Sequence, residues 1–403
     1  MARERSVTTA TEDSELRSLD AVLRTLRPVL RWRYAVLVVV AVAFSLLHLR
    51  GTGDDWSYFR HGSQALLGHH SQLTPLPGGL HFYANYPAYQ IGPLSLLVAA
   101  PLTLVGGGRL LAVLLMTAAA PLLILLLERA ARTVQPPATK RDADLRALTV
   151  LFGGLAAVAS WSSLSTIYAH LDDALTLAAC TGAVAAVAAR RPAWAGAALG
   201  AAVAAKPWGI VALPLAFQFS GRDRRTCLGV AAAIGAAAWL PFLLADSGTL
   251  GAIRPAVTVA PDSVMHLFGV PTADGPAWTR AVQLGLALVV GVLAVRRKKW
   301  PAVLLVAIAV RVALDPQVFL YYAAGLVLAA LAWDLLRTRA PLPVWTLLTF
   351  VFLNDAYAVV PDPRVRAALR LAITAGLVAV VLLAPAARRG AVLAENPLPP
   401  VST

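Results

Sequence analysis

The chain has 403 residues, of which 58% are hydrophobic and only 14% are charged. A soluble domain usually carries about 25% charged residues, so this composition argues against a soluble globular protein. The formal net charge of +14 lies mostly in short loops between apolar runs, which is typical of basic cytoplasmic loops and argues against a nucleic-acid partner.

Apolar runs of membrane length recur along the chain. Examples are residues 34–49, 110–127, 227–244, 283–295 and 317–335. Backbone groups in hydrocarbon must find their partners within their own segment, so these runs are expected to be helices. The sequence therefore predicts an all-α polytopic membrane protein.

Basic clusters predict the topology. The polar segment 1–33 ends in Arg27, Arg31 and Arg33, and it shows no cleavable signal peptide, so 34–49 is expected to be a retained first span that leaves the cytoplasm. Later cytoplasmic markers are 129–146, 190–191, 222–225, 296–299, 337–339 and 388–389. We predict a plasma-membrane protein with one transmembrane domain over 34–385, a cytoplasmic tail over 386–403 and both termini inside.

Between successive basic loops the chain is expected to cross outward and return. The outward tips then fall at 165–173, Lys206, 246–279, Asp315 and 361–366. Run 91–105 is short and contains Pro93 and Pro101, so we interpret it as a re-entrant or interfacial helix, with a full span as the alternative. The prediction is about 12 spans, within a range of about 11 to 13.

The first outward loop, 51–90, is much longer than a connector needs to be and is rich in aromatic and histidine residues. It begins with Asp54 and Asp55. Adjacent carboxylates repel each other, which suits a general base, and they could also hold a divalent cation. The alternative is a solvated loop start, and metal dependence stays open.

The same loop ends in a tyrosine-rich run that includes Tyr83, Asn85 and Tyr86. Tyrosine at a membrane surface is often only an interfacial anchor. Its rings can also stack on a sugar, to which Asn85 could hydrogen-bond.

A histidine and two aspartates open the run that follows the tip 165–173. His170 and Asp173 are three residues apart and share a helix face, so together with Asp172 they could act on a metal or a substrate. An ordinary helix start is the alternative, because the helix dipole favours acids there.

Two cations lie inside apolar stretches. Lys206 precedes Pro207 and Trp208, and a kink there would place its ammonium at a cavity edge, where it could hold a lipid phosphate. Snorkelling to the interface is the alternative.

Arg311 lies four residues before Asp315 and could form a buried ion pair or bind phosphate. Gln317, Tyr321 and Tyr322 follow.

Other enzyme classes lack their motifs in this sequence. It contains neither a Walker loop nor a glycine-rich dinucleotide fingerprint in a strand context, and no nucleophile elbow. The two cysteines, Cys180 and Cys227, lie in or beside apolar runs and suit neither a zinc site nor a disulfide framework.

Four motifs together resemble the C-type (GT-C fold) glycosyltransferases, especially the actinobacterial family-87 polyprenyl-phosphate-mannose-dependent α-1,2-mannosyltransferases, of which this chain would be a divergent member. The motifs are Gly53-Asp-Asp-Trp-Ser-Tyr58, the Tyr-Pro element 83–93 with its proline-spaced continuation to Pro101, the glycine-rich stretch 195–200 with Ala205-Lys-Pro-Trp208, and Leu314-Asp-Pro-Gln-Val-Phe-Leu-Tyr-Tyr322. The likeness in layout extends from about residue 34 to 385. It implies a GT-C-like fold.

The resemblance implies an inverting transferase that moves a sugar, with mannose expected, from a polyprenyl phosphate to a glycolipid or polysaccharide acceptor on the outer face. Asp54 or Asp55 would be the base, and Lys206, helped by Arg60 or Arg311, would neutralise the phosphate. The expected substrate-binding residues are Trp56, Tyr58, His81, Tyr83, Asn85, Tyr86, His170, Asp172, Asp173, Trp208, Gln317, Tyr321 and Tyr322.

Two other classes of function remain possible from the sequence. A lipid or sugar transporter, or a flippase, would also contain intramembrane cations and broken helices. A non-catalytic scaffold of the cell envelope would need no acids at its outer face.

Overall fold

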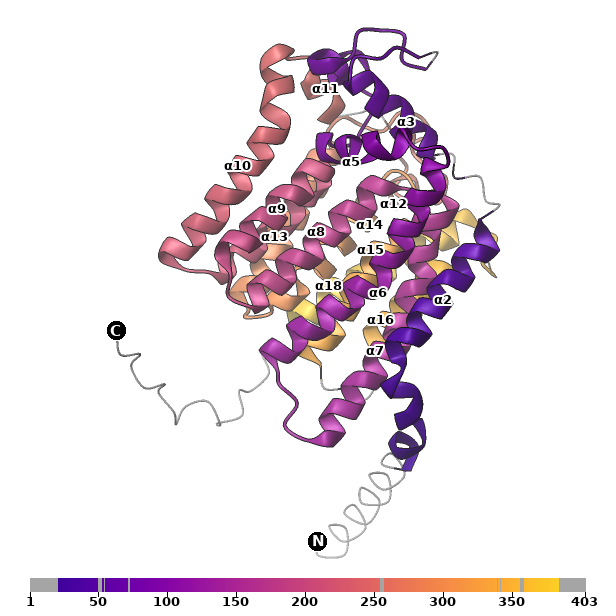
Figure 1. The fold of residues 1–403 in the computed structure, drawn as a ribbon, viewed down its shortest axis with the longest axis vertical. Helices are drawn as coiled ribbons and strands as arrows, with labels where there is room; N and C mark the ends of the chain where they lie inside the picture. Colours follow the sequence, from indigo (N-terminus) through magenta and orange to yellow (C-terminus); the bar gives the residue numbers. More distant parts are fainter. Residues whose placement is uncertain are drawn as a thin grey trace, which may run out of the picture.

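A computed structural model describes residues 21–49, 53, 55–71, 73–253, 257–338, 340, 342–355 and 359–383. The described chain is helical, and its only β-pairing is two isolated bridges (Figure 1). Its elements are α2 (Arg33–His48), α3 (Asp55–Leu66), η1 (Gly79–His81), α4 (Phe82–Asn85), α5 (Pro93–Thr103), α6 (Gly108–Val134), α7 (Lys140–Ser162), η2 (Ser163–Ile167), α8 (Leu171–Ala188), α9 (Pro192–Ala205), η3 (Pro207–Gln218), α10 (Gly221–Ala245), α11 (Thr249–Ile253), α12 (Val264–Leu267), α13 (Thr279–Arg296), η4 (Trp300–Ala302), α14 (Val303–Leu314), α15 (Tyr322–Arg337), α16 (Val344–Phe350), η5 (Val351–Asp355) and α18 (Pro363–Leu383).

Within the described residues, six helices are long and apolar enough to cross a membrane. They are α6, α7 with η2, α8, α10, α13 and α18. The pair Ala21–Arg31 and Arg33–His48, which is bent by 63°, makes a seventh if the two helices form one span. The helices α5, α9, η3, α14 and α16 are apolar but shorter. The polytopic helical membrane class is thus confirmed, whereas the count of about 12 spans stays a prediction.

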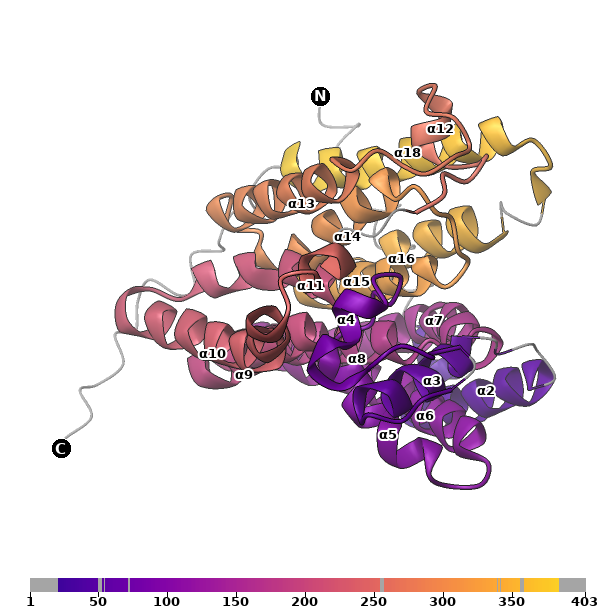
Figure 2. The same ribbon diagram turned by 90° about the horizontal axis from the view of Figure 1, so that it is seen from above.

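The most deeply buried helices are α14 and α15, whose side chains are almost all inaccessible. In the view from above, α2, α5, α6 and α7 lie on one side and α13 and α18 on the other (Figure 2). One buried apolar cluster extends through the bundle from Leu37 to Val381. By contrast, the apolar stretches of α10, α13 and α18 are only 22%, 33% and 28% buried, which suits helices that face lipid.

The predicted outward tips meet at one end of the bundle. The Nδ1 atom of His170 lies 2.9 Å from Asp55 Oδ2, and its Nε2 atom lies 2.9 Å from Lys206 Nζ. Arg280 donates to Asp315 over 3.0 Å. Other contacts at this end join Ala260 N to Pro316 O (2.8 Å), Arg366 to Asp262 (3.4 Å) and His81 to Asp246 (3.2 Å). Helices α3 and α5 also lie at this end, at the top of Figure 1.

The basic loops meet at the opposite end, where the α6–α7 connection lies (Figure 1). Arg33 pairs with Glu128 at 2.9 Å, and Arg27 pairs with Asp144 at 2.8 Å. Arg297 donates to the carbonyl of Leu382 over 2.6 Å. These basic residues therefore lie at the end opposite the predicted outward tips. Which end faces outside stays a prediction.

That orientation can be tested by cysteine labelling with an impermeant maleimide on intact cells. A cysteine at Ser71, in the first loop, should be labelled, and one at Thr139, in the α6–α7 connection, should be protected. The natural Cys180 and Cys227 are buried and should give little background. The reverse pattern would contradict the proposed orientation.

The first loop packs on α10. Tyr83 is fully buried, its hydroxyl donates to Ile91 O over 2.8 Å, and its ring contacts Trp239 and Phe242. At the end of α10, the Gly248 N–H and the imidazole of His81 hold the pKa of Asp246 below its usual range. The first loop is thus folded against α10. The helix α5 that follows it has 11 residues, fewer than the roughly 20 that a membrane span needs.

Candidate functional site

A cavity of about 320 Å³ lies at the end where the predicted outward tips meet. This volume is within the range of small-ligand sites, about 300–1,000 Å³. Its lining comes from segments far apart in the sequence: Asp55, Tyr58, Phe59, Ala88, Tyr89, Gln90, Ile91, His170, Asp172, Lys206, Pro207, Trp208, Arg280, Gln283, Leu284, Arg311, Gln317, Phe319, Tyr321 and Tyr322. Both acids and bases face this cavity.

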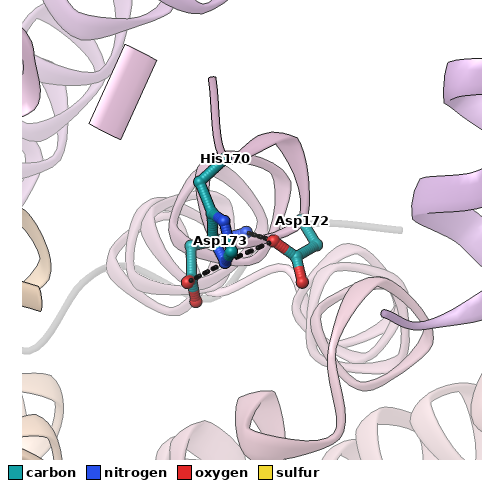
Figure 3. A group of neighbouring side chains, drawn as sticks. All are labelled: His170, Asp172 and Asp173. Carbon is teal, nitrogen blue, oxygen red and sulfur yellow. Dashed lines mark hydrogen bonds and ion pairs between the residues drawn. The ribbon is translucent and has the colours of Figure 1, made fainter. Parts of the chain in front are cut away.

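The start of α8 supplies the acidic side. The chain leaves α7 through the π-helix η2 and turns at Ala169, whose φ is 53°. π-Helical turns often occur at functional sites. His170 then precedes the first turn of α8, and its ring points toward the carboxylates of Asp172 and Asp173 (Figure 3).

The break between α9 and η3 supplies Lys206. Proline at 207 cannot continue the hydrogen bonding of α9, and Lys206 itself is extended, with φ −157° and ψ 134°. The start of α5 buttresses this break, since Gly92 N and Ser95 Oγ both donate to Ala205 O over 2.9 Å. A Cβ on Gly92 would lie 2.2 Å from a backbone oxygen, so the close approach requires glycine.

We call Asp55, His170, Asp172, Asp173 and Lys206 the carboxylate cluster. Lys206 Nζ lies 3.0 Å from Asp172 Oδ2 and 2.8 Å from Asp173 Oδ2. His170 Nε2 lies 3.2 Å from Asp172 Oδ1 and 3.1 Å from Asp173 Oδ2, while its Nδ1 faces Asp55. Three carboxylates thus surround one ammonium and one imidazole.

Burial alone would lower the pKa of His170, because it disfavours the charged ring. The carboxylate of Asp172 and the hydrogen bonds to Asp173 and Asp55 outweigh burial and the repulsion from Lys206, and they raise this pKa to about 9. A proton on Nδ1 donates to Asp55 over 2.9 Å, and Nε2 is left to accept from the Lys206 ammonium at 2.9 Å.

Two guanidinium groups form a second, basic side. Arg280 Nη1 lies 3.0 Å and Arg311 Nη2 lies 3.8 Å from the same oxygen of Asp315. Gln283 ties the group together by donating to Arg311 O over 2.7 Å and to Asp315 over 3.3 Å. Two positive charges therefore share one carboxylate, which leaves this side with a net positive charge.

Arg311 is held in place by aromatic rings. Its guanidinium carbon lies 4.7 Å from the ring centre of Trp208 and 4.6 Å from that of Tyr322. Among the described residues, its buried Nε atom has no hydrogen-bond partner. The ring contacts favour a charged guanidinium.

Aromatic rings line much of the remaining wall. Tyr321 lies over His170 with ring centres 4.4 Å apart, and Phe319 stacks on Tyr321 at 5.3 Å. Tyr58 and Tyr89 meet edge to face at 5.8 Å on another part of the lining. These rings offer flat apolar faces beside polar groups, a combination that suits a sugar ring.

The structure brings most of the candidate residues together. Those that line the cavity are Asp55, Tyr58, His170, Asp172, Lys206, Trp208, Arg311, Gln317, Tyr321 and Tyr322, and Asp173 lies directly behind them. The Asp173 carboxylate is fixed by Trp208, whose Nε1 donates to it over 2.6 Å. Asp54 lies outside the described residues.

Six further candidates lie away from the cavity lining. Trp56, His81, Tyr83, Asn85 and Tyr86 make contacts within the first loop or to α10, and Arg60 is exposed on α3 beside His61. The bonds of Asn85 and Tyr86 go to the carbonyls of Pro77 and Leu76, each over 2.8 Å. In this arrangement these side chains support the loop around the site.

The sequence analysis did not name Arg280, Gln283 or Phe59, all of which line the cavity. Tyr89, Gln90 and Phe319 also line it, and they lay within the motifs 83–93 and 314–322 without an assigned role. Arg280 carried a usable signal, since it directly follows the outward tip 246–279 and begins an apolar run.

Comparison of the chain with protein-family models, with curated proteins and with solved structures finds no match.

Proposed function

We propose that this protein is a membrane glycosyltransferase that moves a sugar, with inversion, from a polyprenyl phosphate to a glycolipid or polysaccharide acceptor on the outer face of the membrane. The observation that carries the proposal is one cavity with two chemically different sides. One side holds a carboxylate bound to a histidine, and the other holds two arginines that share a single carboxylate.

The donor phosphate belongs at the arginine side. Arg280 and Arg311 together carry two charges against the one of Asp315, and guanidinium groups bind phosphate oxygens through paired hydrogen bonds. Cations held at this place stabilise the phosphate as it leaves, because negative charge develops there during transfer. In this proposal Arg280 and Arg311 have the role that the sequence suggested for Lys206.

Lys206 is less suited to hold the phosphate directly. Its ammonium already contacts two carboxylates at 3.0 and 2.8 Å. A phosphate placed against it would also face both of those negative charges. Lys206 therefore compensates the negative charges of Asp172 and Asp173.

Asp55 is the proposed general base. Its carboxylate lines the cavity and receives a hydrogen bond from His170 over 2.9 Å, which orients it. It would take the proton of the acceptor hydroxyl as that oxygen attacks the anomeric carbon from the face opposite the phosphate. The new glycosidic bond forms as the bond to phosphate breaks, so one displacement inverts the anomeric centre.

The lipid chain of the donor has a route into the membrane. Leu284 on α13 and Pro207 on η3 form part of the cavity wall. Beyond them, α13 exposes a row of apolar side chains that includes Val282, Leu286 and Val289. This surface would hold the polyprenyl chain while the phosphate reaches Arg280.

The direct test is an assay with purified protein in liposomes, radiolabelled polyprenyl-phosphate mannose and an envelope glycolipid fraction as acceptor. We expect labelled glycolipid with inverted anomeric configuration, formed about 10²–10⁴-fold more slowly by Asp55→Asn protein. Movement of intact donor across the bilayer without cleavage of its sugar–phosphate bond would instead support a transporter and contradict the proposal.

A further inference from the structure

The ammonium of Lys206 contacts three side chains at the start of α8. Its Nζ atom lies 2.9 Å from His170 Nε2, 3.0 Å from Asp172 Oδ2 and 2.8 Å from Asp173 Oδ2. Figure 3 shows the imidazole of His170 between the carboxylates of Asp172 and Asp173. The ammonium arrives from a different element, the break between α9 and η3.

The same three residues form a ligand set for a divalent cation. One potential ligand atom from each lies within 4.8 Å of the others. One imidazole nitrogen and two carboxylate oxygens suit Mn²⁺ or Zn²⁺, which bind such atoms at about 2.0–2.2 Å. A metal at the position of Nζ would need inward shifts of roughly 1 Å from side chains that now contact an ammonium.

Each of the three side chains is also held from behind, as metal ligands usually are. His170 Nδ1 bonds Asp55, Asp173 Oδ1 accepts from Trp208 Nε1 over 2.6 Å, and Asp172 Oδ1 accepts from the Asp173 amide over 2.7 Å. The ligand atoms would therefore keep their positions if the ammonium were removed.

We propose that Lys206 is a built-in cation that fills a latent divalent-metal site, so that sugar transfer needs no metal at His170, Asp172 and Asp173. Its catalytic part rests on the proposed function, whereas its metal-binding part does not. Lys206 is a positioning residue in this scheme. Its positive charge compensates the negative charges of Asp172 and Asp173. This arrangement keeps His170 in place, and His170 in turn orients Asp55.

Charge explains why removal of the lysine should create a metal site. Asp172 and Asp173 side chains are only 1% and 5% exposed, and buried carboxylates without a counterion are strongly disfavoured. Lys206→Ala removes the positive charge and opens space where Nζ was. A divalent cation would then restore the balance with ligands that are already converging.

The test measures Mn²⁺ binding to purified protein in detergent by electron paramagnetic resonance. Lys206→Ala should bind one Mn²⁺ at least about 100-fold more tightly than the wild type, because affinity rises with the number of available charged ligands. The matched control, Lys206→Ala with Asp173→Asn, should lose most of this gain. Equal affinity in wild type and Lys206→Ala, or no loss in the double variant, would overturn the proposal.

A second measurement serves if Lys206→Ala folds poorly. Protein prepared with Mn²⁺ should then unfold at a higher temperature than the same variant in a chelator, while the wild type should show no difference, because binding to the folded state stabilises it. The absence of any Mn²⁺-dependent rise in the variant would contradict the latent site. Neither readout requires sugar transfer, so failure of the proposed function would be seen separately, in the donor assay.

Discussion

Asp55→Asn is expected to lower the turnover of sugar transfer by about 10²–10⁴-fold, which is the usual contribution of a general base. Asparagine keeps the size of the side chain, and its carbonyl oxygen can still accept the hydrogen bond from His170. It cannot take a proton from the acceptor hydroxyl. The dissociation constant of the donor should therefore stay close to that of the wild type, because the phosphate lies at the arginine side of the cavity.

The matched control is Asp54→Asn, which removes the neighbouring carboxylate. One carboxylate is sufficient for the proton transfer, so this change should cost far less than Asp55→Asn in the same radiolabel assay. Wild-type rates in both variants would show that the base is not in this loop. His170 with Asp172 or Asp173 would then be the next group to examine. Equal, metal-rescuable losses in both variants would instead indicate a cation shared by the two acids.

Arg280→Gln is expected to weaken donor binding by about 10- to 150-fold, since a hydrogen bond to a charged group contributes about 1.5–3 kcal/mol. Arg280 is the better arginine to change because its side chain is 18% exposed, whereas Arg311 is 6% exposed and lies between two rings. Arg311 would still compensate Asp315, so the fold should survive. Titration with polyprenyl-phosphate mannose measures the effect.

Two further variants are compared with Arg280→Gln in the same donor titration. Arg280→Lys keeps the charge and loses only the paired geometry of the guanidinium, so its loss should be milder. Arg60→Gln changes an exposed arginine on α3 that does not line the cavity, and it should leave donor affinity unchanged. Equal donor affinity in wild type and Arg280→Gln would remove Arg280 from the site.

The helical membrane class and the grouping of loops could be predicted from the sequence because their signals are local. Each apolar run satisfies its own backbone groups as a helix, whatever its neighbours do. Basic residues mark one kind of loop by composition alone. The residues expected at the outward tips, such as His170, Lys206 and Asp315, do meet at one end of the bundle.

The ionic partners of the charged side chains were decided by the tertiary structure. Asp55 and His170 are 115 positions apart in the chain, and Arg280 reaches Asp315 from another helix. The sequence indicated that Lys206 is a cation at membrane depth, but its two carboxylate partners belong to α8. Because electrostatic interactions depend on distance in space, only the packing of α8 against the α9–η3 break could show that Lys206 is compensated while the two arginines share one acid.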